Sequence, residues 1–120
     1  MTYLAIHTRT TSAGPVLELT GELDHISCSQ VRDLLPGLVL QRGQQLVIDL
    51  TGVTFCDSSG ITALIAARNH ALATHAGIAL AAVPHHIHRI FTMVGLDQVF
   101  ASYPTAQAAE AAWTPPALPS

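Results

Sequence analysis

The chain has 120 residues, of which 49% are apolar and 11% charged, a composition that excludes a largely disordered protein and suits one domain. Five arginines, no lysine and a net charge of −3 leave no basic run, which argues against nucleic acid as a direct partner. Two distant cysteines, Cys28 and Cys56, are typical of reduced thiols, so we expect a cytoplasmic protein. The chain start does not resemble a signal peptide, and no apolar run reaches the roughly 18 residues of a membrane span.

The first segments predict a β-hairpin followed by a helix. Apolar residues over 3–7 and 16–20 predict two strands, and the turn formers between them favour a hairpin. A polar loop over 21–25 is expected next. A helix is then predicted from Ser27, with Pro36-Gly37 causing a kink or an early stop, because proline removes a backbone donor. The apolar stripe of this helix recurs at helical spacing, at Val31, Leu34, Leu35, Leu38 and Val39.

The rest of the chain alternates strands and helices. Apolar runs predict two buried strands and a short last one, at 46–50, 78–83 and 98–101. Helical spacing predicts three further helices, which end at Gly77, at Gly95 and near Trp113. Pro84 should be the first residue of the second of these helices, Thr105 should cap the third, and Trp113 should anchor it by packing.

Strands that alternate with helices imply a parallel sheet, to which the opening hairpin adds an antiparallel strand. We therefore predict a single α/β domain, in which a mixed, mostly parallel β-sheet with an N-terminal β-hairpin packs against about four helices. Residues 1–113 should form this domain, and residues 114–120 a Pro-rich C-terminal tail.

Asp57-Ser58-Ser59-Gly60 lies where a buried strand gives way to a helix. A serine at that position is a helix cap, a nucleophile or a phosphate acceptor. A nucleophile needs a base and a group that orients it, and seven histidines supply candidate bases. No glycine precedes the serines as it does in a nucleophile elbow, which disfavours a hydrolase. A phosphate acceptor needs only an accessible hydroxyl.

Gly21-Glu22-Leu23-Asp24 taken alone is a solvated loop in which Asp24 or Ser27 caps the next helix. Loops that leave parallel strands gather at one edge of the sheet. Our hypothesis is therefore that Asp24 lies near Asp57 and Ser58, which would make a small acidic surface that carries a hydroxyl.

The histidines at 85, 86 and 88 resemble a metal cluster by residue type only. On a helix only His85 and His88 share a face, and no cysteine or acidic residue lies nearby, so we expect a solvated helix start, no metal and no cofactor. Cys56 is interpreted as a small buried filler rather than a redox centre.

Four motifs occur in order along the chain: Thr20-Gly21-Glu22-Leu23-Asp24, Val47-Ile48-Asp49-Leu50, Phe55-x-Asp57-Ser58-Ser59-Gly60-Ile61 and Ile87-x-x-Ile90-Phe91-x-x-x-Gly95-Leu96. Together they resemble the STAS domain family, and within it the bacterial anti-sigma factor antagonists. The resemblance covers about residues 3–113, and the chain departs from the family pattern at Pro36-Gly37, at Pro84-His85-His86 and in the tail.

The resemblance implies a partner-switching regulator rather than an enzyme. In the family, the unphosphorylated antagonist binds an anti-sigma factor that is also a serine kinase, and this binding frees the sigma factor. Phosphorylation, here of Ser58, ends the binding, and a serine phosphatase resets the switch. The partner-binding residues implied by the resemblance are Gly21, Glu22, Asp24, Asp57, Ser59, Gly60 and Ile61.

Three alternatives stay open at the level of the sequence. The domain is a STAS scaffold subunit of a stress-sensing or lipid-transport complex, a serine hydrolase that uses Ser58, or a module that binds a small ligand. The local sequence also does not separate Ser58 from Ser59 as the phosphate acceptor, since only the resemblance favours Ser58.

Overall fold

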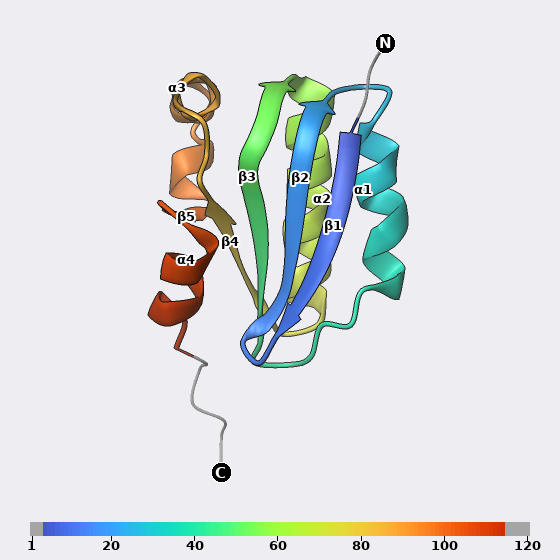
Figure 1. Ribbon diagram of the computed structural model, residues 1–120, viewed down its shortest axis with the longest axis vertical. Coiled ribbons are helices and arrows are strands. Elements are labelled where there is room, and N and C mark those ends of the chain that lie inside the picture. The colour runs from blue at the N-terminus through green and yellow to red at the C-terminus, as the bar shows by residue number, and fades with distance from the viewer. Residues whose placement is uncertain (1–3, 115–120) are drawn as a thin grey trace.

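The computed structural model describes residues 4–114, so most of the predicted tail and the first predicted strand residue, Tyr3, lie outside the described part. Within that range the chain forms a five-stranded sheet, four α-helices and two short 3₁₀ helices (Figure 1). Their bounds are β1 Leu4–Thr11, β2 Gly14–Leu23, α1 Cys28–Leu34, η1 Leu35–Gly37, β3 Gln45–Cys56, α2 Ser58–Ala73, β4 Gly77–Ala81, α3 His85–Met93, η2 Leu96–Gln98, β5 Ala101–Tyr103 and α4 Ala106–Ala112.

The sheet has the strand order β1-β2-β3-β4-β5. The pair β1–β2 is antiparallel and the other three pairs are parallel, which confirms the predicted α/β class with a mixed sheet and an N-terminal hairpin. The connections between the parallel strands carry helices, as parallel pairing requires.

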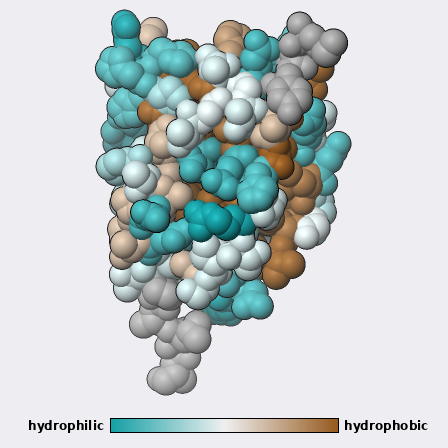
Figure 2. Space-filling view, in the orientation of Figure 1, coloured by the Kyte–Doolittle hydropathy of each residue, from teal (hydrophilic) through white to brown (hydrophobic). Residues whose placement is uncertain are grey.

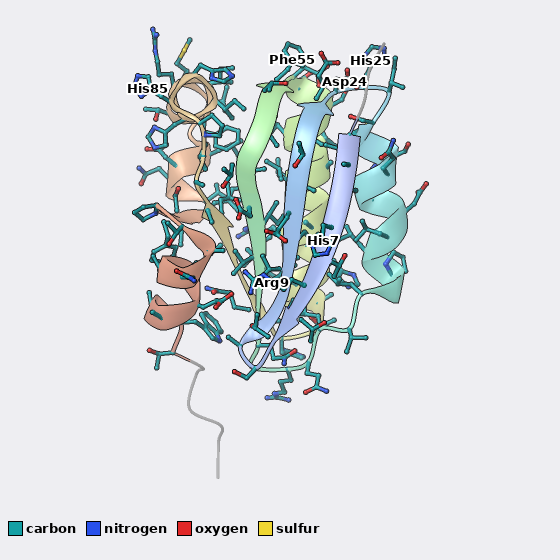
Figure 3. The ribbon with its side chains drawn as sticks, viewed as in Figure 1. His7, Arg9, Asp24, His25, Phe55 and His85 are labelled. Carbon is teal, nitrogen blue, oxygen red and sulfur yellow. The ribbon has the colours of Figure 1, made fainter. Side chains whose placement is uncertain are left out.

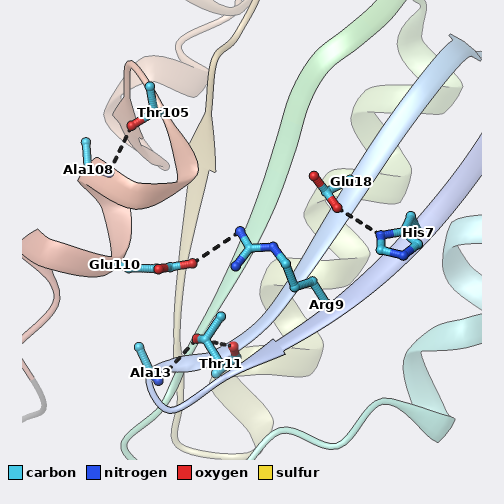
Figure 4. A network of polar contacts seen from close by, with 9 residues as sticks. His7, Arg9, Thr11, Ala13, Glu18, Thr105, Ala108 and Glu110 are labelled. Carbon is cyan, nitrogen blue, oxygen red and sulfur yellow. Dashed lines mark hydrogen bonds and ion pairs between the residues drawn. The ribbon is translucent and has the colours of Figure 1, made fainter.

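Two cores lie on opposite faces of the sheet. The larger core joins the sheet to α1, α2 and α3, and it contains Leu46 and Ile48 of β3. The smaller core lies under α4, and it contains Val47, the residue between them. Because successive side chains of a strand point to opposite faces, β3 is buried on both, as predicted for a central strand. Figure 4 shows polar side chains of β1 and β2, among them His7 and Glu18, on the sheet face that α4 leaves open.

Three strands run further than the sequence predicted, and the first of them, β1, continues to Thr11 instead of ending at His7. The prediction of a polar loop over 21–25 is wrong for residues 21–23, because β2 continues to Leu23. Likewise, β3 continues to Cys56 instead of turning after Leu50. The register between β2 and β3 shifts between Glu18 and Thr20 and again between Gly21 and Glu22. Such shifts break the strict alternation of side chains, so the end of each strand does not show a strand pattern in the sequence.

The first helix takes the second of the two predicted courses, an early stop. α1 ends at Leu34 and the chain continues as η1, with Pro36 inside it. The predicted helical stripe is therefore wrong at its end, where Val39 is 72% exposed. A proline cannot supply the backbone N–H that continued helical bonding needs at this point.

The prediction that Gly77 ends the next helix is wrong. α2 ends at Ala73, and the left-handed residue after it is His75, with φ of 59°. Gly77 instead begins β4, and a Cβ there would lie 2.4 Å from the indole ring of Trp113. The glycine makes room for the tryptophan rather than for a turn.

The C-terminal elements agree with the sequence except for two boundaries. Gly95 ends the α3 segment in the left-handed region, with φ of 80°, and the Thr105 hydroxyl caps α4 by accepting from the Ala108 N–H at 3.0 Å. The last strand begins at Ala101, after η2, and Pro84 is the cap of α3 rather than its first residue. The Trp113 indole N–H donates to the Gly43 carbonyl at 3.0 Å, which confirms the predicted anchor. Over residues 4–114, no helix has the length and apolarity needed to cross a membrane.

Candidate functional site

The ends of β2 and β3 lie side by side and bring the two polar motifs together. Glu22 pairs with Phe55 and Leu23 with Cys56, and the Asp57 N–H then donates to the Leu23 carbonyl at 3.3 Å. Figure 3 shows Asp24, His25 and Phe55 at this same end of the sheet. Parallel pairing is the cause, since the carboxyl ends of neighbouring parallel strands lie at one edge.

Asp24 closes the turn from β2 into α1. It is only 6% exposed, and its Oδ1 accepts from the backbone N–H groups of Ile26 and Ser27, both at 3.0 Å. The Ser27 hydroxyl lies 2.6 Å from the Glu22 carbonyl and accepts from the Asp24 N–H at 3.0 Å. The carboxylate therefore has a structural task in this turn, whatever it contributes to binding.

Asp57, and neither serine, caps α2. Its Oδ1 accepts from the N–H groups of Ser59 at 2.9 Å and Gly60 at 3.1 Å. The interpretation of a serine as the cap is therefore wrong, because the helix already begins at Ser58, one residue earlier than a cap at Ser58 would allow. Ser58 is the first helical residue, and its carbonyl accepts from the Thr62 hydroxyl at 2.9 Å.

The two serines have different surroundings. Ser58 is exposed, and within residues 4–114 its hydroxyl has no hydrogen-bond partner. Ser59 is half-buried and lines a shallow depression between α1 and α2, of about 230 Å³, whose other lining residues are His25, Cys28, Arg32 and Thr62. The tertiary structure thus separates two residues that the local sequence leaves equivalent.

The first turn of α2 packs tightly on the end of β2. A Cβ at Gly60 would lie 2.4 Å from the Leu23 carbonyl oxygen and 2.9 Å from the Cys56 Sγ, so only glycine fits there. Ile61 is half-buried against the larger core. Gly21 lies further back, at the second register shift of β2, where its carbonyl accepts from the Thr54 hydroxyl at 3.3 Å.

An open depression of about 380 Å³ lies between the two strand ends, lined by Glu22, Asp24, His25, Phe55 and Asp57. It brings Asp24 and Asp57 together, as the sequence hypothesis proposed, whereas Ser58 does not line it. Three carboxylates in one depression make it acidic, and Phe55 adds an aromatic wall that is 48% exposed. An acidic depression with an exposed aromatic ring suits a basic side chain of a partner, through charge and cation–π attraction.

Sequence reasoning assigned no role to three surface residues at this end of the molecule: His25, Ile26 and Phe55. Ile26 is 59% exposed, an unusual position for an isoleucine beside a polar turn. The sequence held one sign of an exposed Phe55, since this aromatic residue follows the polar Thr54 at the end of a mostly buried strand. It could be recognised only once β3 was known to continue to Cys56.

Cys56 is a buried thiol beneath the site. Burial, and after it the negative charge of Asp57, raises the pKa of Cys56 from 9.0 to about 12. The group stays protonated at neutral pH, and a protonated thiol is a poor nucleophile and metal ligand, in agreement with the filler interpretation. Within residues 4–114 no cluster of three or more histidine, cysteine or acidic side chains has the arrangement of a metal site.

The start of α3 is tied to the same end of the sheet. The His86 ring Nε2 lies 3.1 Å from the Thr54 carbonyl, so this histidine has a structural contact that the sequence interpretation of a solvated helix start did not include. His85, labelled in Figure 3, is exposed on the same helix.

Comparison with known proteins agrees with this architecture. A family model described as “Mlab, STAS domain” matches residues 6–101. An anti-sigma factor antagonist from Mycobacterium paratuberculosis is 25% identical and superposes with a TM-score of 0.80, over 92% of this chain and 94% of that one. An anti-sigma-factor antagonist (STAS) domain protein from Planctomyces limnophilus is 22% identical, with a TM-score of 0.77 over 91% and 97% of the two chains.

The Bacillus cell fate determinant SpoIIAA, in its phosphorylated form, is also similar in structure. It is 22% identical, with a TM-score of 0.66 over 88% of this chain and 96% of that one. At that identity the similarity concerns the fold. The family model, by contrast, covers most of the chain, from β1 to the start of β5. The chain therefore belongs to the STAS domain family.

Proposed function

We propose that this chain is an anti-sigma factor antagonist that acts by partner switching in the cytoplasm. Its unphosphorylated form binds an anti-sigma factor that is also a serine kinase, and this binding frees the sigma factor. The kinase phosphorylates Ser58, the complex dissociates, and a serine phosphatase restores the first state. The chain itself has no catalytic role.

The exposed hydroxyl of Ser58, without a hydrogen-bond partner in residues 4–114 and placed on the first turn of α2, is the observation that carries this proposal. A kinase needs such an accessible hydroxyl, and Ser59 is less accessible. The similarity to anti-sigma factor antagonists, one of them solved in a phosphorylated form, supports the same role.

The local electrostatics explain why phosphorylation would end binding. A phosphate adds about −1.5 to −2 charges at neutral pH. Asp57 already occupies the N–H groups of Ser59 and Gly60, so a phosphate on Ser58 would add to the negative charge there rather than replace it. The helix macrodipole still favours an anion at this end, so the fold should tolerate the phosphate.

Phosphorylation should therefore lower the binding free energy at the interface with the partner, and not the stability of the fold. A partner surface fitted to a neutral hydroxyl would have to desolvate a charged group that is close to Asp57 and the acidic depression. A loss of about 3 kcal/mol weakens binding more than a hundredfold, since each 1.4 kcal/mol is a factor of ten.

The test is an intact-mass measurement after incubation with ATP, Mg²⁺ and the candidate kinase, together with a binding titration. Wild type and Ser59→Ala should gain one phosphoryl group and then dissociate, whereas Ser58→Ala should gain none and bind persistently. Ser58→Asp should fold and bind at least tenfold more weakly. A phosphate on Ser58→Ala would move the site to Ser59. Stable co-purification with transport or sensor proteins without phosphorylation would favour the scaffold instead.

A further inference from the structure

Two arginines on different faces of the molecule differ in how their charge is used. On the sheet face that α4 leaves open, Arg9 pairs with Glu110 at 3.4 Å. Figure 2 shows hydrophilic surface in the middle of this face. Arg32 of α1 is exposed, and within residues 4–114 it forms no ion pair, since its guanidinium approaches only the Cys28 Sγ, at 3.9 Å. The charge of Arg32 is therefore open to a group from another molecule.

Arg32 lines the depression between α1 and α2, called here the α1–α2 depression, together with His25, Cys28, Ser59 and Thr62. A guanidinium has only donors, and an imidazole and a hydroxyl can each donate. Within the described part of the chain the Ser59 hydroxyl has no hydrogen-bond partner, and no carboxylate lines this depression. Donors without a carboxylate suit an anion, and a carboxylate matches the fork of a guanidinium.

A depression of the opposite charge adjoins it. His25 lines both the α1–α2 depression and the acidic depression, whose carboxylates are Glu22, Asp24 and Asp57. Figure 3 shows His25 beside Asp24 at the end of the sheet. A molecule that fits both depressions needs an acidic side chain for one and a basic side chain for the other. The reversed approach would bring like charges together, so this pair of depressions fixes the orientation of a partner.

Ser58 lies at the rim of the α1–α2 depression. Residues four apart on a helix lie above one another on the same face, as Ser58 and Thr62 do on α2. Thr62 lines the depression, and its hydroxyl donates to the Ser58 carbonyl at 2.9 Å. A phosphate on Ser58 would therefore be a neighbour of the donors in this depression.

We propose that the α1–α2 depression binds the carboxylate of an aspartate or glutamate of the anti-sigma partner, an inference that rests on the function proposed above. A basic side chain of the same partner enters the acidic depression. A phosphate on Ser58 repels the bound carboxylate and competes with it for Arg32, since arginine pairs with phosphate as readily as with carboxylate. Partner binding and phosphorylation thus act on one shared set of donors.

The test is a set of binding titrations with the candidate kinase, in a chain that carries Ser58→Ala so that no phosphate is transferred to that residue. Adding Arg32→Glu should weaken binding by about tenfold or more, because repulsion replaces attraction. Arg42→Glu is the matched control. It changes the net charge equally at an exposed position before β3, at the end of the sheet away from the site, and should leave binding unchanged.

Charge reversal in the kinase then identifies the contact. Exposed aspartates and glutamates of the kinase are changed to lysine one at a time. One of these changes should bring the binding of Arg32→Glu back to within about threefold of the starting pair, and should weaken binding to the chain that keeps Arg32. A merely structural role of Arg32 would not give such a restoration.

Circular dichroism checks that each variant is folded. If Arg32→Glu is not, Arg32→Gln replaces it and should weaken binding by about threefold or more. If Ser58→Ala binds the kinase and the Arg32 variant binds equally well, or no reversed charge restores binding, this inference is overturned while the proposed function stands. If Ser58→Ala does not bind the kinase, the proposed function fails and this inference fails with it.

Discussion

Ser58 and Ser59 are neighbours in sequence and have different chemistry available to them. Successive residues of a helix point about 100° apart around its axis. On the first turn of α2 this rotation exposes Ser58 and turns Ser59 towards the depression between α1 and α2. Asp57 then matters twice, as the cap that holds the turn and as a fixed negative charge next to any phosphate on Ser58.

Cys56 should make the stability of the protein depend on alkaline pH. Its pKa is about 12 in the folded chain and 9.0 for an ordinary thiol, so the unfolded chain loses this proton first. The contribution of the group to stability is complete below pH 9 and is lost as the pH rises towards 12. In that window one such proton steepens the fall of the unfolding free energy by about 1.4 kcal/mol per pH unit.

Urea unfolding of wild type and Cys56→Ala over a pH series measures this effect. The variant should be less stable at pH 7 because it loses buried volume, but its stability should fall less steeply above pH 9. Parallel curves for the two proteins would show that Cys56 ionises equally in the folded and unfolded chains.

At the scale of elements, the contact between α2 and the end of β2 is the tightest part of the site. Gly60→Ala should cost about 1–3 kcal/mol of unfolding free energy, because the new methyl group meets the Leu23 carbonyl. This loss should exceed the gain of about 1 kcal/mol that alanine brings within a helix. Urea unfolding at neutral pH provides the measurement.

Gly37→Ala is the matched control, because a Cβ at that position meets nothing within 4 Å. It should leave stability unchanged or raise it slightly. Equal stability of Gly60→Ala and wild type would mean that the helix start shifts freely against β2, and the rigid placement of Ser58 would then be wrong.

The elements themselves were largely predictable, and their ends were not. Residues that repeat at helical or strand spacing, such as the runs in β3 and α3, show their element directly. The ends of β2 and β3 depend on each other through pairings such as Glu22 with Phe55, between residues far apart in sequence. A register shift in such a pair leaves no periodic mark in either strand.

At the scale of the whole molecule, Trp113 links the C-terminal helix to the opposite end of the sheet from the site. Its indole N–H bonds to Gly43, and its ring lies against Gly77. Trp113→Ala should therefore lower the unfolding free energy by about 2 kcal/mol, less than the loss of a fully buried tryptophan. Trp113→Phe should lose about 1 kcal/mol, the worth of one hydrogen bond.

Urea unfolding followed by circular dichroism measures both, because the variants lack the tryptophan that fluorescence would use. Val94→Ala, at an exposed position, serves as the control and should be nearly neutral. Phosphorylation of Ser58 should be unchanged in folded Trp113→Phe, since α4 covers the other face of the sheet. A tryptophan variant as stable as wild type would show that Trp113 does not help to hold α4 on the sheet.

The sequence by itself determined the α/β class, the hairpin, the helix stripes and the pairing of a serine motif with a helix start. These are local properties, because periodicity and capping act over a few residues. The tertiary structure decided which serine is exposed, and that Asp24 and Asp57 line one depression with Phe55. Each of these depends on register and packing between distant segments, and no short stretch of sequence carries that information.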